Sequence, residues 1–205
     1  MSPRTFTLMT LRHALISLGA VALLAGCAGT NFKRPDQAAL KLGSSTTADV
    51  VAAMGEPSRT GELTKNGSQI KRMSYSYATT MGVGLYAGVI PARSMTFSTA
   101  DGKLVGQQYL SSFNEDGTDF DDSKVPQIVK GTTTRSDVVA LLGRSTGESV
   151  YPLSKNPGEQ AISYLYVHLR KQFLGASKLY TKSLTVSFDA RDVVSDVEFS
   201  VSGEK

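Results

Sequence analysis

Apolar residues recur at helical spacing in two short segments of this chain, and the two segments resemble each other. Residues 43–55 (GSSTTADVVAAMG) and residues 131–143 (GTTTRSDVVALLG) are identical at seven of thirteen positions. Each has a threonine three residues before an aspartate, the spacing of a helix capping box, beginning at Thr46 and Thr134. Each ends in a glycine, which favours helix termination. The pattern predicts two capped helices of two to three turns, too short to persist without packing on something else.

Alternating apolar and polar residues predict three strands after each helix. The expected strands are residues 73–79, 94–99 and 103–111 in the first copy, and 162–169, 183–188 and 193–201 in the second. SYSYAT (74–79) matches SYLYVH (163–168), and RSMTFS (93–98) matches KSLTVS (182–187), both 89 residues apart. We therefore predict an α+β fold of two tandem repeats, each a short capped helix packed on a three-stranded antiparallel sheet, over residues 41–113 and 125–205.

An acidic segment separates the two predicted repeats. NEDGTDFDDS (114–123) has five acidic residues in ten and one large apolar side chain, Phe120. We expect residues 114–124 to be a solvated linker. A calcium loop is the alternative, although the aspartate and glycine positions do not match the spacing of an EF-hand.

The N-terminal region has the pattern of a secretory signal. Arg4 and Arg12 precede about thirteen almost unbroken apolar residues, fewer than the roughly 20 that span a bilayer. LAGC (24–27) resembles the lipobox of bacterial lipoproteins and contains Cys27, the only cysteine of the chain. That resemblance implies removal of residues 1–26 and acylation of Cys27, with residues 27–40 as a lipidated tether. An ordinary cleaved signal is the alternative.

Composition narrows the function classes. Removal of Arg4 and Arg12 lowers the formal net charge from +4 to +2, and no later segment concentrates Lys and Arg, so we expect no nucleic-acid partner. The mature chain has one histidine, His168, and neither a Gly-x-Ser-x-Gly motif nor a phosphate-binding loop. We therefore predict a protein that is not an enzyme, with no cofactor and no metal site.

Two groups of residues are candidates for partner binding. Tyr75 and Tyr77 share one face of a predicted strand, as do Tyr164 and Tyr166 in the second copy, and tyrosine is favoured at interfaces. The alternative is that these tyrosines pack under their own helix.

The second group lies in an uncharged connection, MGVGLYAGVIPA (81–92), which includes Leu85, Tyr86 and Val89. Connections are usually polar, so this segment is a candidate to contact the membrane surface or a membrane-protein partner. The alternative is that it is buried between the two repeats.

The Gly-x-Thr-x-x-x-Asp-Val-x-x-x-x-Gly segments, the Tyr-x-Tyr strands and the Asp-Gly-Lys-Leu-Val hairpin (101–105) resemble the BamE/SmpA/OmlA family of outer-membrane lipoproteins. The resemblance implies a lipid anchor on Cys27 at the periplasmic face of the outer membrane. It also implies a scaffolding role in β-barrel protein assembly or envelope integrity, with the β-barrel assembly machinery or another envelope protein as partner. A tandem of two units is similar instead to secreted β-lactamase-inhibitor proteins, which implies the alternative function of clamping a periplasmic or secreted enzyme.

Overall fold

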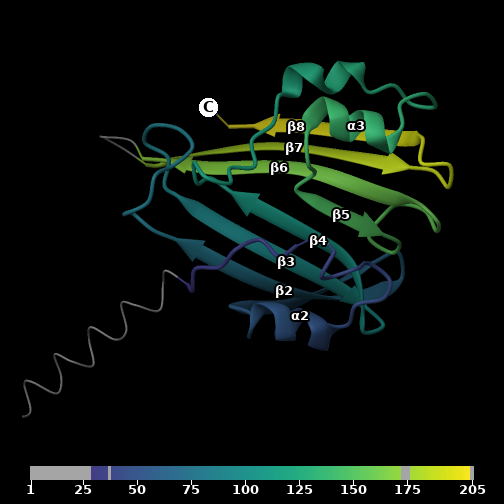
Figure 1. Cartoon of the computed structure of the whole chain (residues 1–205), viewed down its shortest axis with the longest axis horizontal. Coiled ribbons are helices and arrows are strands. Elements are labelled where there is room, and N and C mark those ends of the chain that lie inside the picture. Colours follow the sequence, from purple (N-terminus) through teal and green to yellow (C-terminus); the bar gives the residue numbers. More distant parts are fainter. Residues whose placement is uncertain (1–28, 37, 172–175, 204–205) are drawn as a thin grey trace, which may run out of the picture.

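The computed structural model describes residues 29–36, 38–171 and 176–203, and its centre is one eight-stranded antiparallel sheet (Figure 1). The strands lie side by side in the order in which they occur in the sequence. They are β1 (Arg59–Lys65), β2 (Ser68–Ala78), β3 (Ala92–Ala100), β4 (Lys103–Ser111), β5 (Gly147–Val150), β6 (Gln160–Arg170), β7 (Lys178–Phe188) and β8 (Val194–Ser202). The helices among the described residues are α2 (Thr47–Met54), the 3-10 helix η2 (Asp122–Gln127) and α3 (Arg135–Leu142).

The prediction of two repeats with separate three-stranded sheets is wrong. Each half of the sheet has four strands, and the halves are joined because β4 pairs with β5, with Gln107 opposite Glu148. The two strands missing from the prediction, β1 and β5, are the first after each capped helix. β1 is almost entirely exposed and β5 has only four residues, so neither has a clear apolar alternation to identify it.

The two predicted capped helices are confirmed. Thr46 and Thr134 each accept a hydrogen bond from the backbone of the aspartate three residues later, and that carboxylate accepts from the threonine N–H. The pKa of Asp49 is lowered, first by the backbone hydrogen bond and then by the hydroxyl of Thr46. Each helix buries one valine completely, Val50 in α2 and Val138 in α3, against the sheet.

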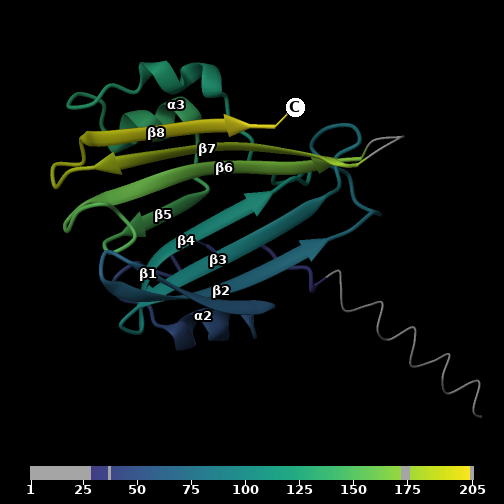
Figure 2. The ribbon, with the colours of Figure 1, turned by 180° about the vertical axis from the view of Figure 1, so that it is seen from behind.

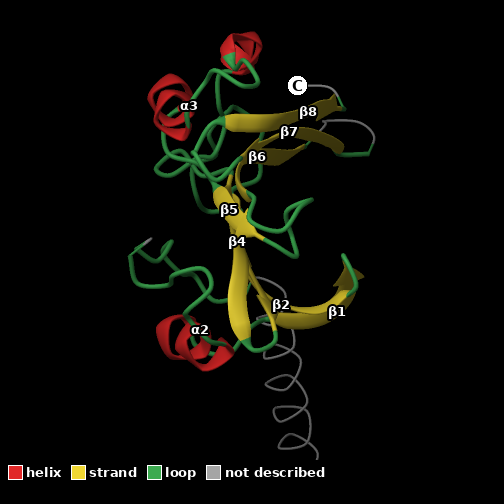
Figure 3. Cartoon of the chain, turned by 90° about the vertical axis from the view of Figure 1, so that its right-hand side faces the viewer, coloured by secondary structure: helices red, strands yellow, loops and turns green. Residues whose placement is uncertain are grey.

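All the helices lie on one side of the sheet, and the sheet curves away from them (Figure 3). Between the helices and the strands are two separate cores. The core of the first half contains Leu40, Val50, Met73, Tyr75, Met95, Phe97, Leu104 and Tyr109. That of the second half contains Phe120, Val125, Ile128, Val138, Ile162, Tyr164, Leu184, Val186, Phe188 and Val194. None of the helices that the structure describes lies over the opposite face of the sheet (Figure 2).

The described part of the segment expected to be a tether packs against the helix-bearing face. The ring of Phe32 meets that of Tyr75 edge-on, with centroids 6.5 Å apart, and Arg34 Nη2 donates to the carbonyl oxygen of Ser145 at 2.9 Å. Burial, followed by the charge of Arg144, lowers the pKa of Arg34 to about 10. From Gly29 onward the chain is thus held against the sheet, whereas the predicted signal and Cys27 lie outside the described residues.

The acidic segment is not a solvated linker. Phe120 is 8% exposed and belongs to the core of the second half. Asp116 accepts hydrogen bonds from the hydroxyls of Tyr109 and Ser111, and Asp119 accepts from the hydroxyl of Tyr86. Within these ten residues the one large apolar side chain, Phe120, points inward while acidic residues flank it. Composition counts the acids but does not show this direction, which is why it suggested a solvated segment.

No helix in the described ranges is long and apolar enough to cross a bilayer.

Candidate binding surface on the open face of the sheet

The open face of the sheet is rich in hydroxyl groups because side chains alternate along each strand. In β3, Met95 and Phe97 point to the core, which places Ser94, Thr96 and Ser98 on the open face. In β7 the core residues Leu184 and Val186 alternate in the same way with serines and threonines. By strand register the hydroxyl residues of this face are Ser68, Ser74, Ser76, Ser94, Thr96, Ser98, Ser149, Ser163, Thr181, Ser183, Thr185, Ser187, Ser200 and Ser202.

A cavity of about 420 Å³ lies in the middle of this face and is lined by both halves of the sheet. The hydroxyl residues that line it are Thr96, Ser98, Ser149, Ser154, Ser163, Thr185 and Ser187. Gly106 forms part of the wall, and an ideal Cβ there would lie 2.5 Å from the Leu153 side chain, so a larger residue would displace that wall. Each hydroxyl can both donate and accept a hydrogen bond, which suits this surface to backbone amides and polar side chains of a ligand.

One end of the cavity is closed by a contact between the two halves. Asn66, in the β1–β2 turn, donates from Nδ2 to the carbonyl oxygens of Pro152 at 3.0 Å and Ser154 at 2.8 Å. The Tyr151 hydroxyl donates to the Asn66 carbonyl oxygen at 3.2 Å. The connection between β5 and β6 is thereby attached to the first half of the sheet.

The same connection is also attached to the second half, at the far edge of the sheet. Lys155 forms ion pairs of 2.5 Å with Asp196 and with Glu198 on β8. Hydrogen bonds from Lys130 and Lys155 hold the pKa of Asp196 well below its usual range. The two carboxylates of β8 are therefore already neutralised by neighbouring lysines.

The first half of the open face carries cations that lack such partners. Register places Arg59, Lys65 and Arg72 on this face, and Lys65 and Arg72 line the cavity. Within the part of the chain that the structure describes, none of the three has an ion-pair partner. The cavity is lined by three cations, Lys65, Arg72 and Lys155, and by two acids, Glu148 and Glu198, so its net charge is positive.

The tyrosines predicted for partner binding are in the interior instead. Tyr75 and Tyr164 are 4% and 1% exposed, and their hydroxyls donate to the carbonyl oxygens of Gly55 and Gly143, both at 2.9 Å. Tyr166 is completely buried, and burial is the main cause of its raised pKa. Tyr75 and Tyr164 belong to the two cores under the helices, as the alternative for them expected. Tyr166 lies on the same face but packs against the rings of Tyr86 and Tyr180.

Tyr77 and the predicted loop residues are not a free surface either. The ring of Tyr77 is half-buried and stacks on Phe113, with centroids 6.0 Å apart. Val89 is 6% exposed and pairs with Arg170, and the half-buried Tyr86 donates to Asp119 at 2.6 Å.

Leu85 is also half-buried, and its Cδ2 lies 2.8 Å from an ideal Cβ on Gly117. Leu85, Tyr86 and Val89 therefore contact the acidic segment or the second half, as the alternative for this loop expected.

His168, the one histidine of the predicted mature chain, is 2% exposed and stacks on Tyr180 with ring centroids 5.2 Å apart. Among the described residues, no group of three His, Cys, Asp or Glu side chains is arranged to hold a metal ion. The candidate binding residues that the sequence analysis did not identify are the serines and threonines of the open face. Their signal was present, because SxTxS occurs in both RSMTFS and KSLTVS, at the polar positions of strands whose apolar positions were read as core.

Neither a family model nor a curated protein matches the chain. Among solved structures, the chain is similar to one from Streptococcus mutans described as a "putative beta-lactamase inhibitor protein". The match has 9% sequence identity and a TM-score of 0.41, and covers 78% of this chain and 90% of that one. At this level the likeness supports no conclusion about the function of the chain, and the resemblance to the BamE/SmpA/OmlA family has no matching family model behind it.

Proposed function

We propose that this protein is a non-catalytic binding protein whose open sheet face receives a protruding, acidic segment of a partner protein. An enzyme of the cell envelope is the partner that we favour, which makes the protein an inhibitor of the clamp type. In this proposal Cys27 carries lipid and holds the protein at the periplasmic face of the outer membrane.

The observation that carries the proposal is the concave face that continues across both halves of one sheet and that no described helix covers (Figures 2 and 3). At one end of its first half, Leu153 of the β5–β6 connection packs on Ile70, Ala100 and Val105. Continuous strand pairing between β4 and β5 keeps the two halves of this surface in register, so little ordering is needed when a partner binds. The face extends well beyond the cavity, and a small molecule would leave most of it uncovered. Arg59, Lys65 and Arg72 favour an acidic partner by charge complementarity.

The first test uses photo-crosslinking in living cells. A crosslinking amino acid in place of Thr96, on the open face, is compared with one in place of Val139, which is exposed on α3. We expect crosslinks to one major partner from position 96 that Arg72→Glu abolishes, and none from position 139. The purified partner, if an enzyme, should lose activity on addition of this protein in detergent and keep it with the Arg72→Glu variant.

Other outcomes have definite meanings. Equal crosslinking from both positions would contradict a binding role for the open face. Recovery of the β-barrel assembly machinery from position 96 would favour the assembly role. No contact among the described residues supports that role. Lipidation is tested separately, because Cys27→Ala should release the protein from membranes, and unchanged membrane association would exclude the lipid tether.

A further inference from the structure

We infer that one end of the molecule lies against the lipid surface that holds Cys27 and inserts apolar side chains into it. This end, here called the apolar tip, is formed by Met81, Val83, Leu169 and Leu179. The inference rests on the lipid tether of the proposed function and is independent of what the open face binds.

The most exposed large hydrophobic side chains among the described residues lie in the apolar tip. Met81 is 94% exposed, Val83 71% and Leu179 58%. The next, Val129 at 52%, lies elsewhere, before α3. Exposure of this degree is unfavourable in water unless another surface covers the side chains.

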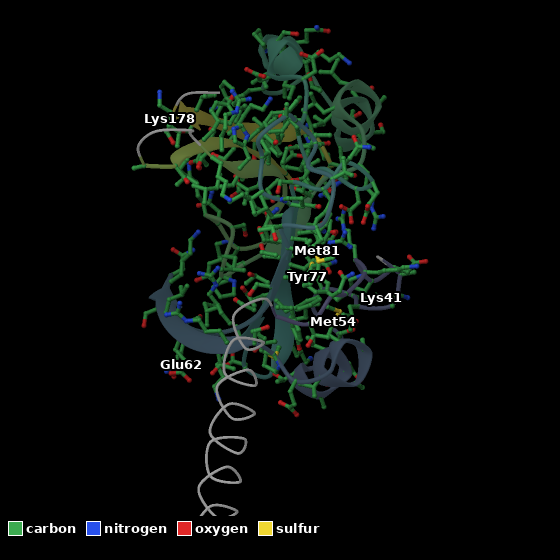
Figure 4. The ribbon with its side chains drawn as sticks, turned by 90° about the vertical axis from the view of Figure 1, so that its left-hand side faces the viewer. Lys41, Met54, Glu62, Tyr77, Met81 and Lys178 are labelled. Carbon is green, nitrogen blue, oxygen red and sulfur yellow. The ribbon has the colours of Figure 1, made fainter. Side chains whose placement is uncertain are left out.

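Backbone hydrogen bonds join the connection that contains Met81 and Val83 to the end of β6 that contains Leu169, although the bonded residues are about 80 positions apart in the sequence. Ile90 N donates to the Leu169 carbonyl oxygen at 3.1 Å, and Lys171 N donates to that of Gly88 at 3.1 Å. Both segments lie at the left-hand end of the molecule in Figure 1, and Figure 4 views that end directly, with Met81 and Lys178 labelled.

The chain toward Cys27 leaves from the same end. The backbone of Gly29 lies against β2, where an ideal Cβ would be only 1.9 Å from the Ser76 carbonyl oxygen. Two residues reach at most about 7 Å, so Cys27 cannot be far from this point. A lipid chain on Cys27 therefore requires a membrane surface close to the last residues of β2, from which the segment with Met81 continues.

The charge of the apolar tip suits an anionic lipid surface. The sequence has no acidic residue from position 79 to 92 or from 165 to 182, whereas Arg170, Lys171 and Lys178 lie in the second range. Lys182, also in that range, is buried and paired with Asp119 and Asp122 and does not contribute. Lys171 and Lys178 are exposed, and exposed cations beside inserted apolar groups strengthen binding to anionic membranes. The apolar tip therefore offers both the apolar side chains and the cations of a peripheral membrane contact.

In the orientation that results, the cavity on the open face stays accessible to a partner. The contact between Asn66 and the β5–β6 connection lies at the opposite end of the strands, at the right in Figure 1. With the apolar tip on the membrane, the closed end of the cavity points away from the lipid. Leu169 and Leu179 lie on the same face of the sheet as Thr181, so the lipid surface meets only this end of the open face and leaves the cavity accessible to the partner.

The test uses the full-length, lipid-bearing protein in vesicles of phosphatidylethanolamine and phosphatidylglycerol. Cys27 is the only cysteine, so after its acylation a cysteine introduced elsewhere is the only thiol open to labelling. Val83→Cys is labelled with a polarity-sensitive fluorophore and compared with Val129→Cys, an exposed valine outside the apolar tip. We expect a blue shift and quenching by lipid-borne quenchers at position 83 only. The same water-exposed signal at both positions would overturn the inference.

A second measurement covers the case in which labelling disturbs the segment. In the Cys27→Ala chain, replacing both Met81 and Val83 by Asp should lower vesicle partitioning by roughly tenfold or more, whereas Val129→Asp should leave it unchanged. Equal loss in both variants, or none in either, would also overturn the inference. Labelling of Cys27 itself would show that its thiol is free and would exclude the lipid tether. Partner binding by the open face is measured in detergent, so it is a separate result.

Discussion

Arg93 in β3 and Lys182 in β7 occupy matching positions in the two halves of the sheet, 89 residues apart, and both are buried cations. Arg93 pairs with Glu115 at 2.6 Å and Asp116 at 3.4 Å, and lies over the ring of Phe113. Lys182 pairs with Asp119 at 2.7 Å and Asp122 at 2.8 Å, and lies over the ring of Phe120. All four carboxylates come from the acidic segment, so one connection neutralises the equivalent cation in each half.

The two pairings differ in how far water reaches the partners. The partners of Arg93 are 68% (Glu115) and 31% (Asp116) exposed, and those of Lys182 are 10% (Asp119) and 44% (Asp122). The nearest partner of Lys182 is thus the driest of the four carboxylates. Burial acts to lower the pKa of Lys182, but its hydrogen bonds to Asp119 and Asp122 outweigh that effect and raise it. A cation therefore occupies this position in both halves of the sheet. The second half depends more on its ion pairs, because Asp119 is less accessible to water than the carboxylates that pair with Arg93.

The largest expected effect is from Lys182→Ala. It leaves Asp119 and the Phe120 carbonyl oxygen without their buried donor, and should lower the free energy of unfolding by about 3–5 kcal/mol. Arg93→Ala should cost less, because water can solvate Glu115. Chemical denaturation measures both, with the exposed Lys103→Ala as the matched control.

The pH dependence of this effect has a definite sign. A lysine pKa raised in the folded state adds stability that is complete below about pH 10.5 and is lost as pH rises further. The cost of Lys182→Ala should therefore hold through neutral pH and shrink in alkali. An equal cost for Arg93→Ala and Lys182→Ala would show that the difference in exposure does not matter.

Next in size is Asp116→Asn, which tests the first-half end of the acidic segment. Asp116 accepts hydrogen bonds from Tyr109 at 2.6 Å and Ser111 at 2.5 Å besides its contact with Arg93. We expect a loss of about 1–3 kcal/mol, since a neutral amide cannot accept all three. Glu115→Gln, at a mostly exposed carboxylate, should cost less than about 1 kcal/mol, and a reversed order in the denaturation curves would contradict this ranking.

A contact that is the same in both halves should give equal effects. Tyr75→Phe and Tyr164→Phe each remove a 2.9 Å hydrogen bond to the glycine that ends a helix, at about 1 kcal/mol each. Burial raises the pKa of Tyr164 to about 12, so the stability it adds is complete below pH 10 and is lost between pH 10 and 12. Thermal unfolding against pH would show this loss in the parent and not in Tyr164→Phe.

The smallest effect is expected at the helix caps. Thr46→Ala and Thr134→Ala each remove one capping hydroxyl from an exposed helix end, and should cost about 0.5–1 kcal/mol. Replacement by Ser retains the hydroxyl and should restore most of the loss. A clear difference between the two threonines in urea unfolding would mean that the caps, identical in geometry, are not equivalent in energy.

The sequence predicted the local elements well where pattern and end signals coincide. Thr46 with Asp49 and Thr134 with Asp137 identified both helices, because a capping box is a contact between residues three apart. The sequence did not predict the strands Arg59–Lys65 and Gly147–Val150. These strands are defined by hydrogen bonds to their neighbours and not by a pattern of apolar residues of their own. The tyrosines were misplaced as binding residues because periodicity assigns residues to a face without saying which face is covered.

The sequence by itself determined the duplication, the capped helices and the alternation that gives both halves an apolar and a hydroxyl face. Only the tertiary structure decided that the two halves share one sheet, because pairing of β4 with β5 joins backbones about forty residues apart. It also decided that the acidic segment packs against both halves, since its buried partners Arg93 and Lys182 come from strands on either side of it in the sequence. Local signals extend over a few residues, whereas charge burial and sheet pairing depend on which distant residues the fold brings together.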